Sequence, residues 1–251
     1  MGFLIGLLAG IFGGLAGIGG GIVMIPLMVG ILKMGQHKAH GTSLVALVFT
    51  GISGAITYAI HGSIDLIASL LIAGTAIFMA RAGAHYAHFL SEQKLKRSFG
   101  AFMIVISLLL LMKPLSPQFG QPVLGWTKIT VLLATGIASG FLSGMMGVGG
   151  GSIMVPALVL LVGFTQHTAQ GSALLAMVPA GGVGAFTHWR LGNVDVKLVP
   201  GLIPGILIGT CLGGACAHML AEETLRLVFV GMLIWMGLKY LRRPIAGDDS
   251  L

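Results

Sequence analysis

Residues Gly10–Leu44 read GIFGGLAGIGGGIVMIPLMVGILKMGQHKAHGTSL, and residues Gly140–Leu174 read GFLSGMMGVGGGSIMVPALVLLVGFTQHTAQGSAL. A shift of 130 residues aligns the two stretches without a gap. The matching positions include the glycine runs, a proline, a Gln-His pair and a later glycine: Gly17, Gly19, Gly20, Gly21, Pro26, Gln36, His37 and Gly41 match Gly147, Gly149, Gly150, Gly151, Pro156, Gln166, His167 and Gly171. Self-similarity at a fixed offset indicates that one unit of roughly 120 residues is duplicated.

The composition predicts a membrane protein. Of the 251 residues, 56% are hydrophobic and only 8% are charged, whereas soluble domains carry about 25% charged residues. No Asp, Glu, Lys or Arg occurs between Lys128 and Arg190, and this run is long enough for more than two spans of about 20 residues. The 41 glycines fit close helix packing in lipid. We therefore predict an all-α polytopic membrane protein embedded in the lipid bilayer.

The net charge of +7 does not indicate a nucleic-acid partner. The basic residues lie in short connectors between apolar runs, where they set orientation and contact anionic head groups. Cys211 and Cys216 lie in one apolar run without the CxxC or Cys/His spacing of a metal site. We therefore interpret both cysteines as small packing residues, and we expect no metal or other cofactor.

The chain divides into two halves with the same order of segments. We predict a first repeat at residues 1–112, a connector at 113–126, a second repeat at 127–241 and a polar tail at 242–251. Each half begins with a segment broken by glycines, which is either a re-entrant hairpin or two short helices, and continues with three spans. The broken segments are residues 2–33 and 127–163, and the spans are residues 39–60, 66–89, 95–112, 169–189, 198–220 and 225–241.

The distribution of Lys and Arg favours one arrangement of these segments. If each broken segment crosses the membrane once, the basic residues divide almost evenly between the two sides. If each enters and returns, most basic residues share a side, and only Lys113, Lys128 and Arg226 oppose them. The positive-inside rule then places both termini in the cytoplasm. Each half has an odd number of crossings in this arrangement, so the halves are inverted repeats.

The glycine runs are the first candidates for a functional site. They permit sharp turns and a close approach of the backbone, and a helix that restarts after such a break offers free N–H groups to an anion. We predict a substrate site formed by Gly19, Gly20 and Gly21 with Gly149, Gly150 and Gly151, and helix breaks or gates at Gly17, Pro26, Gly147 and Pro156. The alternative is close packing between helices, which small residues also permit.

Several polar residues in or near the spans are further candidates. Arg81 lies inside an apolar run, where a charge marks function by default, although its side chain can also reach the interface. The hydroxyls of Thr42, Ser43 and Ser172 can donate to an anion or cap a helix. His188 can carry a coupling proton or be an interfacial histidine.

Other polar residues fit structural roles. Asp65 and Asp195 begin matched spans, and we interpret them as helix caps. No carboxylate lies within a predicted span, and the eight histidines are scattered. We therefore expect no metal site, and we expect that the protein is not an enzyme, because an intramembrane hydrolase needs a nucleophile with a base or a metal.

The doubled motif resembles the sulfite exporter (TauE/SafE) family of permeases. The resemblance covers nearly the whole chain and rests on the two glycine motifs with Pro26 and Pro156, on Ala39–Leu44, and on the segments Gly62–Asp65 and Gly192–Asp195. It implies a permease of the bacterial inner membrane for sulfite, organosulfonates or other small sulfur-containing anions. The family often carries Arg-Leu-Gly after the third span. Here Ala80–Gly83 keeps the arginine as Arg81, whereas Cys211–Gly213 lacks it.

Together these features predict a secondary transporter of small sulfur-containing anions that works by alternating access. The anion is expected between the two glycine breaks, with Arg81 compensating its charge. A permease for another small anion or for a neutral sulfur compound is the alternative, and a membrane-embedded enzyme or a partner subunit is a further one. A homo-oligomer is compatible with each of these hypotheses.

Overall fold

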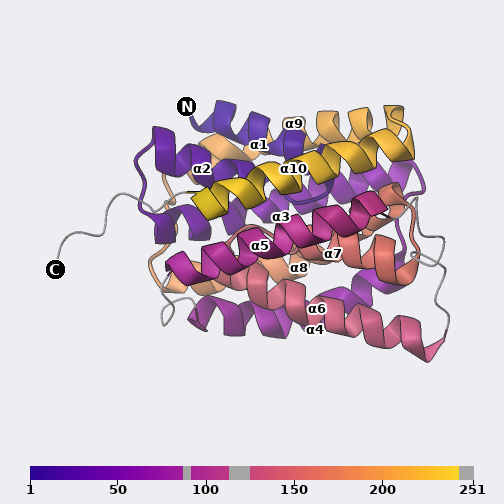
Figure 1. The fold of residues 1–251 in the computed structure, drawn as a ribbon. Coiled ribbons are helices and arrows are strands. Elements are labelled where there is room, and N and C mark those ends of the chain that lie inside the picture. The colour runs from indigo at the N-terminus through magenta and orange to yellow at the C-terminus, as the bar shows by residue number, and fades with distance from the viewer. Residues whose placement is uncertain (87–91, 113–124, 243–251) are drawn as a thin grey trace.

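The computed structural model describes residues 1–86, 92–112 and 125–242. Within these ranges the chain forms ten α-helices and one π-helical segment (Figure 1). In chain order they are α1 Gly2–Ala16, α2 Gly21–Ile31, α3 Gln36–Ile60, α4 Leu66–Tyr86, α5 Glu92–Met112, α6 Trp126–Met146, α7 Gly151–Ala157, η2 Leu158–Val162, α8 Gln166–Arg190, α9 Val199–Met219 and α10 Glu222–Arg242. Every regular element of the described residues is therefore a helix, as the composition predicts.

The helix ends follow the predicted segments. The first broken segment contains α1 and α2, which are separated by Gly17–Gly20, and the second contains α6, α7 and η2, with the interruption at Gly147–Gly150. Helices α3, α4, α5, α8, α9 and α10 correspond to the six predicted spans. The end of the span 66–89, most of the connector 113–126 and most of the tail 242–251 lie outside the described residues.

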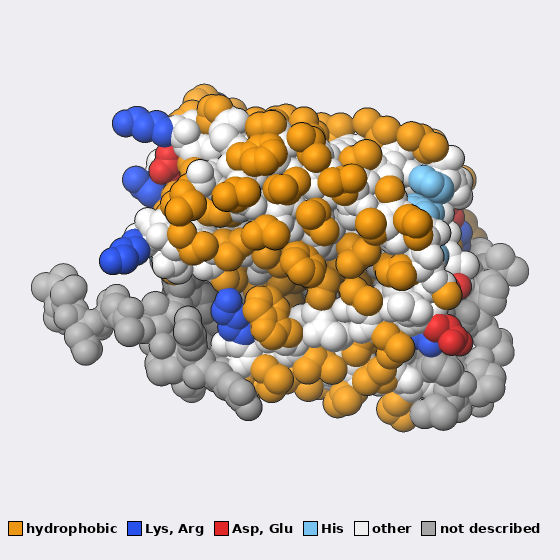
Figure 2. Space-filling view, turned by 90° about the horizontal axis from the view of Figure 1, so that it is seen from above, with side chains coloured by type: hydrophobic (Ala, Val, Ile, Leu, Met, Phe, Trp, Pro, Cys, Tyr) orange, Lys and Arg blue, Asp and Glu red, His pale blue; other side chains and the backbone are white. Residues whose placement is uncertain are grey.

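The surface of the helix bundle is apolar. Helices α3, α4, α6, α8 and α9 are long and apolar enough to cross a membrane, whereas α5 contributes a shorter apolar stretch, Met103–Met112. Large apolar side chains on the five long helices are exposed, among them Ile56, Phe78, Ile137, Phe186 and Ile208. Figure 2 shows such side chains spread over one face of the molecule. Contiguous apolar surface of this extent indicates contact with lipid, so the chain is a multi-pass membrane protein.

Two helix pairs show that the halves pack in the same way. Helix α1 lies along α9, and at an offset of 130 residues α6 lies along α4. Glycines bring the backbones together, and the facing residues are Gly6 with Leu202 and Gly14 with Thr210 in the first pair, and Gly136 with Ile72 and Gly144 with Ala80 in the second. Each contact of one pair recurs in the other. The residue numbers rise together in both pairs, so the paired helices run parallel.

Helices α3 and α8, which occupy equivalent places in the two halves, pack against each other. A Cβ on Gly54 would lie 2.7 Å from Leu174 Cδ1, and a Cβ on Gly184 would lie 3.4 Å from Leu44 Cδ1. At the 130-residue offset these are the same contact, seen once from each half. Since residue 54 meets residue 174 while residue 44 meets residue 184, the two helices run antiparallel. The packing thus follows an approximate two-fold axis that passes between α3 and α8.

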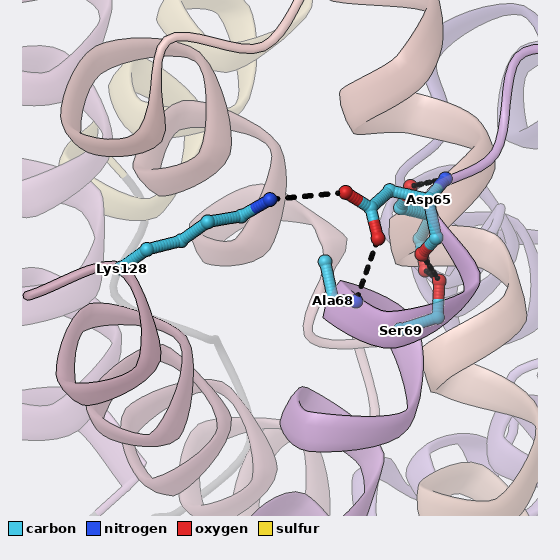
Figure 3. A network of polar contacts seen from close by, with 5 residues as sticks. Asp65, Ala68, Ser69 and Lys128 are labelled. Carbon is cyan, nitrogen blue, oxygen red and sulfur yellow. Dashed lines mark hydrogen bonds and ion pairs between the residues drawn. The ribbon is translucent and has the colours of Figure 1, made fainter. Parts of the chain in front are cut away.

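The second broken segment starts and ends at the same end of the bundle. Lys128 lies in the first turn of α6, and its Nζ lies 5.0 Å from the ring centre of Phe164, which follows η2. The same Nζ lies 3.2 Å from Asp65 Oδ2, beside the start of α4 (Figure 3). The chain therefore runs inward along α6, turns at the glycines and returns along α7 and η2.

The first broken segment makes the same return. Helix α1 begins beside the start of α9, where Gly2 packs on Leu198. This end also holds the start of α3, because the Asp195 N–H donates a hydrogen bond to Thr42 Oγ1 over 2.9 Å. Helix α2 ends at Ile31, only four residues before α3 begins. The α1–α2 segment is therefore a helical hairpin whose turn lies inside the bundle.

We expect Gly140→Val to disrupt the α4–α6 packing. A Cβ on Gly140 would lie 2.5 Å from Ala76 Cα, whereas no heavy atom lies within 4 Å of a Cβ on Gly74 in α4. Overpacking of this kind costs about 1–3 kcal/mol. Thermal melting in detergent measures the effect, and Gly74→Val is the control that should melt close to wild type. Equal melting temperatures for the two variants would contradict the described contact.

Candidate functional site

The two glycine breaks meet inside the molecule. A Cβ on Gly21 would lie 2.8 Å from the Gly147 carbonyl oxygen, and a Cβ on Gly151 would lie 2.8 Å from Ile18 Cα. Residues 17–22 and 147–156 are all buried. The breaks of the two halves thus touch through their backbones, without side chains between them. We call this contact the glycine junction and define it by residues 17–21 and 147–151.

Positive φ angles explain why glycine occupies these turns. Gly17 and Gly147 end α1 and α6 in the left-handed conformation, with φ angles of 67° and 63°, and Gly19 and Gly149 have φ angles of 91° and 84°. A Cβ disfavours this region of backbone space. Close packing, the alternative role weighed for these glycines, is therefore present as well, because the turns and the contact between them need the same residue type.

Two helices restart at the glycine junction. The first α-helical bond of α2 runs from Met24 N–H to the Gly20 carbonyl, and that of α7 runs from Met154 N–H to the Gly150 carbonyl, each over 2.9 Å. Amide groups that precede such a bond have no acceptor four residues earlier in the helix and lie at the positive end of its dipole. The junction therefore gathers partial positive charge from the backbone alone.

Two apolar side chains cover the glycine junction. A Cβ on Gly149 would lie 3.0 Å from Leu47 Cδ2 and 3.2 Å from Met177 Sδ, and a Cβ on Gly19 would lie 3.1 Å from the same sulfur. Leu47 in α3 and Met177 in α8 are themselves 130 residues apart and fully buried. In this conformation, apolar side chains from both halves lie against both breaks.

The predicted prolines lie inside the restarted helices. Pro26 lies in α2 and Pro156 in α7. Helix α7 gives way to the π-helical segment η2 two residues after Pro156. Proline removes a backbone donor inside a helix, and a local π-helical adjustment accommodates such a defect. Pro156 therefore marks a local irregularity in the returning arm of the second half.

The predicted hydroxyl residues connect the two halves. Thr42 Oγ1 accepts the Asp195 N–H, and Ser172 Oγ accepts the Asp65 N–H over 2.9 Å, which is the equivalent bond. Ser43 Oγ donates to the Gly147 carbonyl over 2.7 Å. All three hydroxyls thus bind backbone groups of the opposite half, and Ser43 reaches the glycine junction directly.

The two aspartates act as caps, as predicted. Asp65 Oδ1 accepts the Ala68 N–H over 2.9 Å at the start of α4, and Figure 3 shows the carboxylate between this amide and Lys128. Asp195 Oδ1 accepts the Leu198 N–H over 3.3 Å just before α9. These carboxylates stabilise helix starts and lie away from the glycine junction.

Arg81 and His188 lie in different surroundings. Arg81 is exposed on α4, next to Ala80, whose backbone packs on Gly144. It is therefore not buried with the glycine junction. His188 is only 2% exposed, and its Nε2 lies 3.0 Å from the Gly144 carbonyl oxygen, to which an Nε2–H donates. His188 thus contacts the helix that leads into the second break.

Sequence analysis missed two residues beside the first break. The Tyr58 hydroxyl lies 2.7 Å from Gln170 Oε1 and 3.0 Å from the Gly14 carbonyl oxygen. Gln170 packs on Gly17, because a Cβ on that glycine would lie 2.6 Å from Gln170 Cβ. The 130-residue offset contains a signal for the first residue, since Tyr58 is the equivalent of His188 and makes the equivalent contact.

Three histidines gather at the end of the bundle where α3 and α9 end. The ring of His218 stacks on His61 with centroids 4.0 Å apart and lies 5.2 Å from the ring of His167. Its Nε2 lies 3.3 Å from Ser63 Oγ. Within the described residues, no group of three or more His, Cys, Asp or Glu side chains is arranged to hold a metal ion.

We expect Thr42→Val to destabilise the protein by about 1–3 kcal/mol, because it leaves the Asp195 N–H without an acceptor. Thr42→Ser keeps the hydroxyl and is the matched control. Thermal melting and anion transport are measured on all three proteins. A Thr42→Val protein that melts like wild type but fails to transport would assign the hydroxyl to the substrate and contradict the structural role.

Comparison with known proteins adds an independent finding. The model of the family described as Sulfite exporter TauE/SafE matches residues 2–240. The chain is 29% identical to the "Probable membrane transporter protein YunE" of Bacillus subtilis (strain 168), over 96% of this chain and 97% of that protein. It is 28% identical to a "Probable membrane transporter protein" of Xylella fastidiosa (strain 9a5c), over 94% and 92% of the two chains.

A more distant relative is the "Sulfite exporter TauE/SafE family protein 5" of Arabidopsis thaliana. It is 28% identical over 39% of this chain and 22% of its own length. No solved structure matches the chain. The family model covers both glycine breaks and all described helices except the last two residues of α10. The chain therefore belongs to the sulfite exporter TauE/SafE family of membrane transporters.

Proposed function

We propose that the protein is a secondary transporter of small sulfur-containing anions such as sulfite or organosulfonates, and that it binds the anion at the glycine junction. The observation that carries this proposal is the direct contact between the two breaks, at which two helices restart. Backbone N–H groups and helix dipoles at such a point favour negative charge without a permanent positive charge in the membrane. Family membership supports the substrate class.

We infer that the halves are inverted in the membrane. The equivalent helices α3 and α8 run antiparallel along each other, and both are long enough to cross. Two equivalent helices that cross in opposite directions relate the halves by an axis in the membrane plane. The hairpins α1–α2 and α6–η2 then enter from opposite sides and bring their glycine turns together near the middle of the bilayer.

The charged residues support a bacterial inner-membrane protein with cytoplasmic termini. Lys33, Lys38, Arg190 and Lys197 belong to connectors or helix ends at the end of the bundle where α1, α3 and α9 begin. Figure 2 shows most of the visible Lys and Arg side chains at one end and the visible His side chains at the other. The positive-inside rule makes the basic end cytoplasmic.

Alternating access requires that the glycine junction open to one side at a time. Leu47 and Met177 cover it in this conformation, so an anion has to displace them. The hydrogen bonds of Thr42 to Asp195 and of Ser172 to Asp65 connect the halves at opposite ends of the bundle. We propose that one of these bonds opens in each half-cycle and frees a hydroxyl for the anion, together with Ser43.

Arg81 and His188 have accessory roles in this proposal. The exposed guanidinium of Arg81 lies toward the cytoplasmic end of α4 and attracts anions from that side, an effect that salt screens. His188 is buried against the helix that leads into the second break and is the candidate carrier of a coupling proton. The glycine junction itself supplies the binding energy.

We expect Gly21→Ala to abolish sulfite transport in proteoliposomes. Its methyl group would lie 2.8 Å from the Gly147 carbonyl oxygen, and overpacking by about 1–3 kcal/mol corresponds to about tenfold or more in occupancy of the site. Gly182→Ala in α8 is the control, because no heavy atom lies within 4 Å of its Cβ. Arg81→Gln should lower the rate by less than the junction variant does.

The outcomes separate the parts of this proposal. Wild-type protein that moves neither sulfite nor methanesulfonate, although it is monodisperse and folded, would refute the sulfur-anion assignment. Wild-type transport that Gly21→Ala leaves intact would refute binding at the glycine junction.

The proposed orientation is tested with single cysteines in a background without Cys211 and Cys216. A membrane-impermeant maleimide added to intact bacterial cells should label Met219→Cys at the end of α9, and should label Gly35→Cys, before α3, only after permeabilisation. Met219 is 85% exposed, and no heavy atom lies within 4 Å of a Cβ on Gly35. The reverse labelling pattern would place the termini outside.

A further inference from the structure

Gln170 is a buried amide whose orientation is fixed. The side chain has no solvent-exposed surface, and neither does Tyr58. The Tyr58 hydroxyl lies 2.7 Å from Gln170 Oε1, and only an oxygen can accept this hydrogen bond while the tyrosine donates. The amide oxygen therefore faces Tyr58, and the amide nitrogen faces away from it.

The amide nitrogen of Gln170 has no hydrogen-bond partner among the described residues. It carries two N–H donors, and a buried polar group without a partner is disfavoured enough that each case calls for an explanation. A ligand that brings acceptors to the nitrogen provides one. The oxygen of the same amide is satisfied, so the unmet need is for an acceptor only.

The position of Gln170 shows where this acceptor binds. Its Cα, Cβ and Cγ pack against Gly17, the first residue of the first break. The equivalent residue in the other half is His40, which packs in the same way against Gly147. The two halves therefore place a nitrogen-bearing side chain at the same point of each break, an amide on one side and an imidazole on the other.

We propose that Gln170 is a binding residue for the transported anion, that its amide nitrogen donates hydrogen bonds to an oxygen of a sulfite or sulfonate group, and that Tyr58 is the positioning residue that orients it. This inference rests on the proposed function and adds a specific side chain to a site otherwise formed by backbone. An amide donor keeps the site neutral when it is empty, which limits the cost of burying it in the membrane.

The site selects acceptor-rich anions. The amide oxygen, the one group that would attract a cation, is occupied by Tyr58. An oxyanion presents several acceptors to the remaining nitrogen, and a hydrogen bond with an ionised partner is stronger than a neutral one. A neutral sulfur compound without oxygen would leave the donors unpaired and bind weakly.

The test compares Gln170→Glu with Gln170→Met in proteoliposomes that take up labelled methanesulfonate, which stays singly charged because sulfonic acids are strong. Glutamate is isosteric and accepts from Tyr58 through the same oxygen. When protonated it donates an O–H to the anion, and when ionised it repels the anion. Methionine keeps the size and never donates. Uptake is measured between about pH 5 and about pH 9, a range that includes the ionisation of a buried glutamate.

We expect the KM of Gln170→Glu to exceed that of wild type at the alkaline end by at least about tenfold and to approach it at the acidic end, because a hydrogen bond to a charged group is restored there. Gln170→Met should show the raised KM at every pH. Tyr58→Phe should raise KM with little change in kcat, because the amide is intact but no longer oriented.

Gln166 supplies a matched control. It lies one turn earlier in α8, is equally buried and also has an unpartnered amide, but its segment contacts Glu222 of α10. Gln166→Met should leave KM unchanged. The titratable groups near Tyr58 are His218, His61 and His167, while α1 carries none in its own sequence. They are present in every variant, so wild type measured at each pH corrects for them.

Three outcomes would overturn the proposal. If Gln170→Glu and Gln170→Met are folded and take up methanesulfonate with the wild-type KM, Gln170 does not bind the anion. If both lose uptake equally at every pH while their melting temperatures fall, the residue is structural. If folded wild type moves neither methanesulfonate nor sulfite, the anion assignment itself fails, and the ligand proposed for Gln170 fails with it.

Discussion

The backbone contact between the two glycine breaks is the constraint on which the rest of the structure depends. Gly21 lies against the Gly147 carbonyl, and Gly151 lies against Ile18. Lipid gives helices no hydrophobic reason to associate, so close packing and backbone hydrogen bonds hold a membrane bundle together. A side chain larger than hydrogen at the junction would push the halves apart. The hairpins must therefore end in glycines, and α3 and α8 must lie close enough to enclose them.

The two-fold packing extends outward from this contact. Helices α1 and α6 do not pack mainly on spans of their own half; they lie along α9 and α4 of the other half. Each half thus holds the hairpin of its partner, and the loop bonds of Thr42 and Ser172 cross between halves in the same sense. A relative movement of the halves changes both ends of the molecule together, as a carrier with alternating access requires.

The symmetry of the backbone is not repeated in the polar side chains beside the breaks. Tyr58 and Gln170 flank the first break, whereas the equivalent positions hold His188 and His40. The backbone geometry needs none of these side chains, since the glycines alone make the turns. The difference in chemistry therefore separates two tasks on one scaffold, a neutral donor on one side and titratable imidazoles on the other.

Local sequence patterns predicted most of the fold. The interruption of apolar runs by glycine placed both breaks, and run length placed the spans. Asp65 and Asp195 were predicted as caps because a cap depends only on the next few residues. Thr42 and Ser172 remained ambiguous between an anion and a cap, because their actual partners lie in the other half. Tyr58 and Gln170 are single polar residues in apolar helices, 112 residues apart, and form no local pattern.

By itself, the sequence determined that this protein is a duplicated helical membrane chain with two glycine breaks, because duplication, hydropathy and glycine turns are properties of neighbouring residues. Only the tertiary structure decided that the breaks touch each other, that Leu47 and Met177 cover them, that Arg81 is exposed, and that the Gln170 amide lies oriented beside Gly17. These facts depend on how antiparallel α3 and α8 bring distant residues together, and on which donors and acceptors are left over once the backbone has been satisfied.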